Sequence, residues 1–252
     1  SDGENTQFNM LKRLELSGEQ QAALLDHCQT RGITYICTPY DFESAAMLDR
    51  IDVPAYKIAS TDTTNTPLLR VIEGFRRPVI LSTGMCTLSE VEEAVVALER
   101  VRDRLALLHC TSAYPAPPEA SNLAAMGTLR SAFQVPVGFS DHSTGVGMAP
   151  FAVAAGAEVV EKHFTLDRSL SGPDHQASIE PQELRALILQ IRMVEKAMGD
   201  GIKAPAEVEM LNIPAMRKSV VAAVNIPAGT VLSTANLSLK RPGTGLAPKW
   251  YE

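Results

Sequence analysis

Short runs of apolar residues recur along most of the chain and alternate with longer segments of helical periodicity. A continuous apolar run of this length is typical of a strand that is buried on both faces of a parallel sheet. Such runs occupy residues 33–38, 55–60, 78–83, 105–112, 136–140 and 158–165. The pattern therefore predicts β–α units joined by right-handed crossovers.

The segments between these runs carry helix-start signals. Ser17 and Gln20 form an S-x-x-Q capping box, and Thr87 and Glu90 form an equivalent T-x-x-E box. Pro181 suits the first turn of a long amphipathic helix. These signals predict helices over residues 20–31, 91–104 and 182–198.

The number of β–α units is two short of a (β/α)8 barrel, and residues 8–15 look like the loop and helix of an earlier unit. We therefore expect an α/β fold of the TIM-barrel type, with its first two strands absent from this chain. A six-stranded doubly wound sheet is the alternative.

The pattern changes after Gly199. Residues 200–216 hold prolines and charges without periodicity, and residues 217–230 suggest two short strands around a Pro-Ala-Gly turn, followed by a third strand at 237–240. A module of roughly 36 residues is too small for a secure core of its own. The predicted organisation is a barrel domain over residues 1–201, a linker over 202–216 and a small, C-terminally incomplete domain over 217–252.

Composition excludes several kinds of partner and location. The chain has 252 residues, is 45% hydrophobic and has a formal net charge of −6, so we expect neither nucleic acid nor an anionic membrane as a partner. No apolar run is long enough to span a membrane, and the first residues are polar. The four cysteines show no CxxC pairing, which favours free thiols in a reducing, cytoplasmic setting.

Two histidines close neighbouring strand-like runs. His142 follows the run at 136–140, and His163 lies near the end of the run at 158–165. Adjacent parallel strands would bring the two imidazoles to one edge of the sheet, where α/β folds place their chemistry. Imidazole is a common divalent-metal ligand, so the pair predicts a metal site. The alternative is two polar strand-end residues that pair with carboxylates.

Hydroxyl side chains and one lysine recur at the predicted strand ends. A ring of donors with one positive charge suits a phosphate or carboxylate group. Lys57 either points into such a pocket or extends along the surface to solvent, and a lysine at a barrel strand end can also be a Schiff-base nucleophile. The members of this set are Thr38, Lys57, Ser60, Ser82, Ser112 and Ser140.

Three further candidates lie in loops beyond the strand ends. Asp174 could orient a substrate or act as an acid or base, although a turn aspartate is the simpler interpretation. Tyr114 begins a stiff proline-rich segment that would present its ring at the pocket mouth. Asp62 follows Ser60 in the same way.

Taken together, these segments resemble the sialic acid synthase family. The resemblance runs in collinear order from about residue 10 to residue 245. It is carried by Cys37-Thr-Pro-Tyr-Asp-Phe-Glu43, Ala55-Tyr-Lys-Ile-Ala-Ser60, Leu81-Ser-Thr-Gly-Met85, His109-Cys-Thr-Ser-Ala-Tyr-Pro115, Gly138-Phe-Ser-Asp-His142, Glu161-Lys-His-Phe-Thr165 and Gly172-Pro-Asp-His-Gln-Ala-Ser178.

The resemblance implies a (β/α)8 barrel followed by a small antifreeze-protein-like (SAF) domain. It implies a transferase that condenses phosphoenolpyruvate with an N-acylated mannosamine-type sugar, using a divalent metal, usually Mn²⁺, with Mg²⁺ or Co²⁺ as alternatives. The acceptor sugar stays open among N-acetylmannosamine, its 6-phosphate and 2,4-diacetamido-trideoxyhexoses. A synthase of 3-deoxy-sugar acids, a Schiff-base aldolase and a non-catalytic carbohydrate-binding protein are the rival hypotheses.

The resemblance also assigns roles to residues of this chain. His142 and His163 become metal ligands, and Lys57 and Asp174 become the catalytic candidates. Arg241 resembles an arginine that the small domain inserts into the partner subunit's barrel, which implies a domain-swapped homodimer. The resemblance assigns phosphoenolpyruvate binding to Thr38, Lys57, Ser60, Ser82, Ser112 and Ser140. It assigns sugar binding to Asp62, Tyr114, Asp174 and Arg241.

Overall fold

The apolar runs form a parallel sheet in which every strand lies beside its neighbour in sequence. The computed structural model describes residues 7–251, and its five-stranded sheet has the order β1-β2-β3-β4-β5. A doubly wound sheet reverses its order at a switch point, so the consecutive order favours the arc of a barrel over that alternative. The strands are β1 (Tyr56–Ile58), β2 (Val79–Ser82), β3 (Leu105–Cys110), β4 (Val137–Asp141) and β5 (Val160–Lys162).

The first predicted strand, at residues 33–38, does not form as such. Its only ladder contact is a parallel bridge between Cys37 and Tyr56, in which the Lys57 N–H donates to the Cys37 carbonyl at 3.1 Å. Ile33 is 61% exposed and Ile36 40% exposed. Within residues 7–251 no other strand pairs with the 33–38 segment on the side away from β1. The segment therefore lacks the second set of backbone hydrogen bonds that would bury and extend it.

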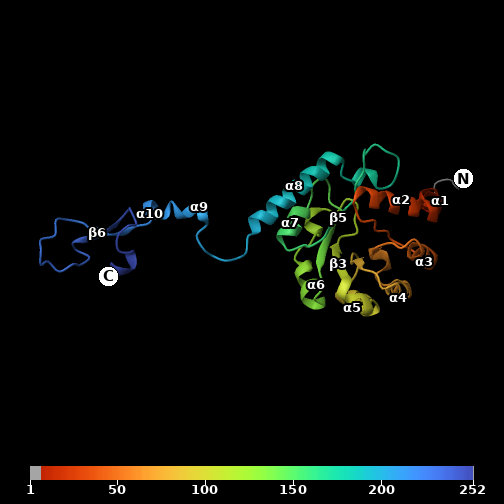
Figure 1. Cartoon of the computed structure of the whole chain (residues 1–252), viewed down its shortest axis with the longest axis horizontal. Coiled ribbons are helices and arrows are strands. Elements are labelled where there is room, and N and C mark those ends of the chain that lie inside the picture. Colours follow the sequence, from red (N-terminus) through yellow and green to blue (C-terminus); the bar gives the residue numbers. More distant parts are fainter. Residues whose placement is uncertain (1–6, 252) are drawn as a thin grey trace. The chain divides into compact units, whose positions relative to one another are not determined.

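Helices alternate with the strands and pack against one another in sequence order. Contacts join α2 to α3, α3 to α4, α4 to α5, α5 to α6, and α7 to α8. Figure 1 shows these helices in an arc around the labelled strands β3 and β5. The helices of this unit are α1 (Gln7–Leu14), α2 (Gly18–Arg31), α3 (Phe42–Arg50), α4 (Thr66–Gly74), α5 (Leu88–Ala97), α6 (Ala125–Phe133), α7 (Ala149–Ala154) and α8 (Pro181–Met198). Short 3₁₀ turns add Ser60–Asp62, Glu99–Arg104, Pro118–Ala120 and His175–Ala177.

The predicted capping boxes set two of these helix starts. Ser17 accepts from the Gln20 N–H while the Gln20 side chain accepts from the Ser17 N–H, and Thr87 and Glu90 repeat the arrangement. The helix after Thr87 ends at Ala97, earlier than predicted, because the chain tightens into the 3₁₀ turn before β3.

Alternate strand residues face two different environments. Tyr56 and Ile58 of β1, Leu81 of β2 and Leu107 of β3 are buried in one hydrophobic cluster with side chains of α4, α5 and α6. Because successive side chains of a strand point to opposite faces, the intervening residues, such as Lys57, point away from the helices. The helix-facing residues supply this cluster, and the opposite face carries the polar groups of the site along with buried apolar residues such as Leu108.

A second compact unit begins at Gly199. It holds the short helices α9 (Glu207–Met210) and α10 (Ile213–Met216), the antiparallel pair β6 (Ser219–Ala222) and β7 (Leu237–Lys240), and a 3₁₀ turn at Pro248–Trp250. Three strands were expected between 217 and 240, and two are present: the residues directly after the Pro-Ala-Gly turn do not pair. No helix in the described part of the chain is long and apolar enough to cross a membrane.

Candidate active site

A cavity of about 600 Å³ opens at the carboxyl ends of the strands. All of the residues predicted for the site line it, except Asp62 and Arg241. They come from the 33–38 segment and from the five strands β1 to β5, and each lies on the inner face of its strand or in the loop that follows. A polar cavity at this edge is where barrel-type folds place their active sites.

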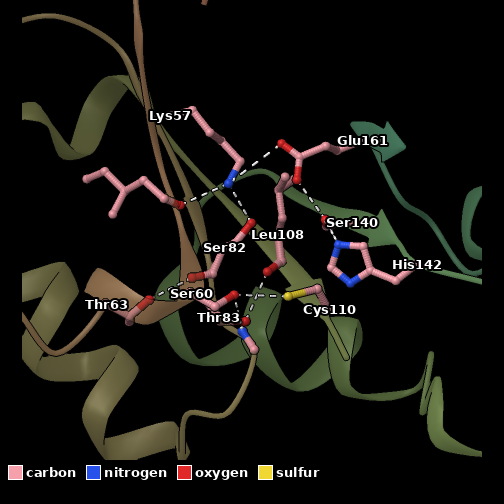
Figure 2. A network of polar contacts seen from close by, with 12 residues as sticks. Lys57, Ser60, Thr63, Ser82, Thr83, Leu108, Cys110, Ser140, His142 and Glu161 are labelled. Atoms are coloured by element: carbon pink, nitrogen blue, oxygen red, sulfur yellow. Dashed lines mark hydrogen bonds and ion pairs between the residues drawn. The ribbon is translucent and has the colours of Figure 1, made fainter. Parts of the chain in front are cut away.

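Lys57 lies at the centre of a polar network (Figure 2). Its side chain is 12% exposed, and Nζ donates to Ser82 Oγ at 2.7 Å and to the Ile58 carbonyl at 2.9 Å. A carboxylate oxygen of Glu161 lies 3.6 Å from the same nitrogen. Burial lowers the pKa of Lys57, and the Glu161 carboxylate opposes that shift. The lysine therefore points into the cavity rather than along the surface to solvent.

Glu161 links the lysine to the histidine side of the cavity. Its second oxygen accepts a hydrogen bond from Ser140 Oγ at 2.7 Å, and Ser140 Oγ lies 3.4 Å from His142 Nε2. Ser140 and Glu161 are register partners on β4 and β5, which explains why they meet on one face of the sheet. The result is a continuous line of polar groups from β1 to β5.

Gly84 lets the hydroxyl groups approach one another. Its N–H donates to Ser60 Oγ at 2.9 Å, and Ser60 Oγ lies 3.1 Å from Cys110 Sγ. A Cβ at position 84 would collide with Ser112 Oγ and lie 2.7 Å from Cys110 Sγ. Only glycine therefore fits between these side chains without displacing them.

His142 and His163 face each other with ring centroids 5.4 Å apart. His142 Nδ1 lies 2.8 Å from the Thr111 carbonyl, which can only accept, so the proton lies on Nδ1 and Nε2 keeps its lone pair. Burial lowers the pKa of His142, which favours the neutral imidazole that a metal needs.

The residues present fit a divalent metal ion with an incomplete protein ligand set. Two imidazoles face one space, and the hydrogen bond from His142 to the Thr111 carbonyl is the kind of contact that orients a metal-bound histidine. No group of three or more His, Cys, Asp or Glu side chains suited to a metal occurs in the described chain. A metal held here would therefore keep positions open for substrate or water, as catalytic metal sites do.

Tyr114 and Asp174 lie beside the histidines. The Tyr114 ring centroid is 4.3 Å from that of His142 and 5.6 Å from that of His163, and Tyr114 is 57% exposed. An oxygen of Asp174 lies 3.9 Å from His163 Nδ1. Burial raises the pKa of Tyr114, so the phenol stays protonated as a hydrogen-bond donor.

Two predicted site residues are not in the cavity wall. Asp62 is buried in the 3₁₀ turn after β1, where its oxygens accept from Asn65 Nδ2 at 2.9 Å and Thr61 Oγ1 at 3.3 Å. Arg241 lies in the second unit, directly after β7. Their sugar-binding roles stay predictions.

The main site residue that sequence reasoning missed is Glu161. It lies in the same strand run as His163, two residues earlier, and two-residue spacing places both side chains on one face. That alternation was the available signal. Tyr40, Thr61, Met85, Cys110 and Lys162 also line the cavity.

Comparison with known proteins places the chain in a family. Residues 1–203 match the NeuB family and residues 217–252 match the SAF domain. The chain is 45% identical over 252 residues to N,N'-diacetyllegionaminic acid synthase of Campylobacter jejuni, covering 99% of this chain and 75% of that protein. It is 37% identical to N-acetylneuraminate-9-phosphate synthase of Mus musculus, covering 91% and 64%.

A solved structure gives the same result. N-acetylneuraminic acid synthetase from Leptospira borgpetersenii, in complex with citrate, matches with a TM-score of 0.78 and 38% identity over 84% of this chain and 74% of that chain. The chain belongs to the NeuB family of synthases and carries a SAF domain. The resemblance stated from its motifs is confirmed.

Proposed function

We propose that this chain condenses phosphoenolpyruvate with an N-acylated mannosamine-type sugar, giving a sialic acid or a related nonulosonic acid and phosphate. One observation carries the proposal: a single cavity has a buried lysine and hydroxyl groups on one side, and a facing pair of histidines with Asp174 on the other. The lysine side suits a substrate that carries both a phosphate and a carboxylate group, and the histidine side suits an aldehyde activated by a metal.

The lysine side holds phosphoenolpyruvate. Lys57 supplies the positive charge, and the hydroxyls of Thr38, Ser60, Ser82, Ser112 and Ser140 supply hydrogen bonds to the phosphate and carboxylate oxygens. Fixing both ends of the molecule directs its C3 atom toward the histidine side, and this positioning is a large part of the rate enhancement.

The histidine side holds a divalent metal, with Mn²⁺ the first candidate and Mg²⁺ or Co²⁺ the alternatives. His142 and His163 would be its protein ligands, and when bound the ion supplies Lewis-acid polarisation of the open-chain sugar aldehyde. Tyr114 and Asp174 lie where they can hydrogen-bond the sugar hydroxyls.

The reaction joins C3 of phosphoenolpyruvate to the aldehyde carbon, adds water at C2 and releases phosphate by C–O cleavage. Positive charge develops at C2 before water adds. Glu161, between Lys57 and Ser140, is an acceptor that can hold this water and take its proton. Asp174, beside His163, can carry a proton to the former aldehyde oxygen, which becomes a hydroxyl group.

A substrate panel tests the proposal. The chain is incubated with phosphoenolpyruvate, Mn²⁺ and each of N-acetylmannosamine, its 6-phosphate and a 2,4-diacetamido-trideoxyhexose, and phosphate release and product mass are measured. The relative at 45% identity is named for N,N'-diacetyllegionaminic acid, so we expect the diacetamido sugar to react best. If the folded protein releases no phosphate with any of these sugars, the proposal is contradicted.

The charge of Glu161 should set the pH range over which Lys57 binds phosphoenolpyruvate. Burial lowers the pKa of Lys57 and Glu161 opposes this, so Glu161→Gln should lower that pKa further. Binding needs the protonated lysine. Therefore kcat/KM for phosphoenolpyruvate should fall at a lower pH in the variant than in the wild type.

The matched control is Glu158→Gln, an exposed position before β5 on the same run. A pH–rate profile of all three proteins checks the prediction. An alkaline limb that stays in place, or moves upward, in Glu161→Gln would show that the carboxylate does not support the charge of Lys57.

We also propose a homodimer in which Arg241 of one subunit serves the cavity of the other. The support is the family resemblance of Arg241 and the small size of the unit that carries it. A guanidinium can hydrogen-bond the N-acyl carbonyl of the sugar. Arg241→Ala should raise the KM for the sugar about 10-fold or more, the cost of one hydrogen bond to a charged group, with divalent-metal affinity unchanged.

Subunit mixing separates this arrangement from a monomeric site. Arg241→Ala mixed with His142→Ala should regain activity, because a mixed dimer contains one undamaged composite site. A monomer in sedimentation at micromolar concentration, or no regain after subunit exchange is demonstrated, would contradict it.

A further inference from the structure

A buried ion pair lies directly before the two histidines. Asp141 precedes His142 at the end of β4, and Lys162 precedes His163 at the end of β5. The two are register partners, and Lys162 Nζ lies 3.1 Å from Asp141 Oδ2. Their side chains are 0% and 4% exposed, the most deeply buried of the ion pairs in the described chain.

The carboxylate of Asp141 is fully used by donors from three segments. Oδ1 accepts from the Ser143 N–H at 2.9 Å and from Ser143 Oγ at 2.5 Å, and Oδ2 accepts from the Ala149 N–H at 3.2 Å. Together with Lys162, these donors tie the end of β4 to the end of β5 and to the start of α7. A buried carboxylate with this many charge-assisted bonds holds its backbone in one place.

The lysine completes the arrangement from the other strand. Its Nζ donates to the Ser143 carbonyl at 2.7 Å as well as pairing with Asp141. His142 lies in sequence between Asp141 and Ser143, so the ammonium group is bonded on both sides of that histidine. Lys162 is itself joined through its own peptide to His163.

The loop that follows His142 is shaped around this pair. Gly147 has φ +61°, and a Cβ there would collide with Ser143 Oγ and lie 2.9 Å from Asp141 Oδ2. The Met148 N–H donates to Ser143 Oγ at 3.1 Å. Glycine at this position therefore both permits the left-handed backbone and leaves room for the bonds of Asp141.

Neither residue of the pair is assigned a role in the proposed reaction. Alternation along the strand sends Asp141 to the face opposite Ser140 and His142, toward the loop 143–149. Lys162 lines part of the cavity, yet its ammonium is bonded to Asp141 and Ser143. The pair is therefore placed to hold the backbone of both histidines rather than to contact substrate.

We infer that the Asp141–Lys162 ion pair is a positioning element that fixes the separation and facing of the His142 and His163 imidazoles. The effect of the ion pair on metal binding rests on the proposed function. Its effect on the geometry of the two rings does not depend on that proposal. Two protein ligands on separate strands can bind one ion only if the strand ends keep a fixed spacing, and the ion pair is the side-chain link between the residues next to the two histidines.

The primary test needs no metal. In protein with labelled histidines, the two rings, 5.4 Å apart, should give cross-peaks between their ring protons in NMR spectra. Asp141→Asn and Lys162→Met each remove one charge with little change of shape, and we expect both to weaken or abolish these cross-peaks. Cross-peaks of wild-type intensity in both folded variants would overturn the inference.

The control separates positioning from a general loss of stability. Glu73 is a buried carboxylate on α4 that accepts from the Arg100 N–H at 3.0 Å and pairs with Arg100 Nε at 3.9 Å. Glu73→Gln should lower the melting temperature without changing the histidine cross-peaks. If it weakens them as much as Asp141→Asn does, the effect is global and the inference fails.

Metal affinity is the second readout. Mn²⁺ titration calorimetry should show about 10- to 100-fold weaker binding in Asp141→Asn and Lys162→Met, the usual cost of removing a residue that orients a ligand, and wild-type affinity in Glu73→Gln. If the wild-type chain binds no divalent metal, the metal proposal fails, and the cross-peaks still decide the inference.

A double variant covers the case in which neither single substitution folds. Asp141→Asn combined with Lys162→Met removes the ion pair and leaves no unpaired charge buried. Weaker cross-peaks in this folded variant would support the inference. Cross-peaks of wild-type intensity would overturn it.

Discussion

Replacing His142 or His163 with alanine should remove most of the divalent-metal affinity and lower turnover by at least about 100-fold. Loss of a residue that merely orients a metal ligand typically costs 10- to 100-fold, and here one of two facing imidazoles is lost outright. The described chain offers no third side chain grouped with the pair to take its place. Calorimetric titration with Mn²⁺ and an assay of phosphate release would measure both effects.

His27→Ala is the matched control, because His27 is an exposed residue on α2. It should leave metal binding and turnover at wild-type levels. Wild-type Mn²⁺ affinity and turnover in His142→Ala or His163→Ala would show that the histidine pair does not hold the metal.

Replacing Lys57 with alanine should raise the KM for phosphoenolpyruvate by about 10- to 100-fold. A hydrogen bond to a charged group contributes about 1.5 to 3 kcal/mol, and about 1.4 kcal/mol corresponds to a factor of ten. Lys57 is the charge at the centre of the hydroxyl groups, and its loss also leaves Glu161 without its cation. Steady-state kinetics with phosphoenolpyruvate varied would measure the change, with exposed Lys203→Ala as the control.

The same lysine separates the synthase from an aldolase that works through a Schiff base. We expect no covalent adduct when the wild-type chain is treated with pyruvate and borohydride, because Lys57 Nζ is occupied by Ser82, the Ile58 carbonyl and Glu161. Intact-protein mass spectrometry would detect an imine trapped on Lys57. Such an adduct would favour the aldolase mechanism instead.

Five of the six predicted strands form, and the reason can be found in the sequence itself. Runs such as 105–112 are apolar on both faces, and only a sheet covered on both sides satisfies them. The run at 33–38 has the same composition, yet it makes a single bridge because strand pairing depends on a partner as well as on composition. The β-strand propensity of a segment does not show whether a pairing partner lies beside it.

The site was predictable where strand alternation fixes side-chain direction. Lys57, Ser82 and Ser140 each lie at a strand position that turns away from the helices, and all line the cavity. Asp62 lies one turn further along, where the 3₁₀ backbone directs its carboxylate to Asn65 instead. Beyond a strand end, direction is set by local hydrogen bonds that spacing does not reveal.

The ion pair next to the histidines could not be predicted from the sequence. Asp141 and Lys162 look like ordinary polar strand-end residues in the sequence. Their mutual burial depends on the register of β4 against β5, a pairing that only the structure gives. The same register brings Glu161 to Ser140.

The consecutive order of the five strands bears on how the molecule forms. Each strand pairs with the next one along the chain, so every step closes a loop of one β–α unit, and the chain entropy lost in closing a loop grows only slowly with its length. Sheets built from near-neighbour pairings form faster than sheets with distant ones. The cavity takes residues from both ends of this sheet, with Lys57 and Ser82 on its first two strands and His163 directly after its last. The anion-binding side can therefore face the histidines only once β5 has joined the sheet.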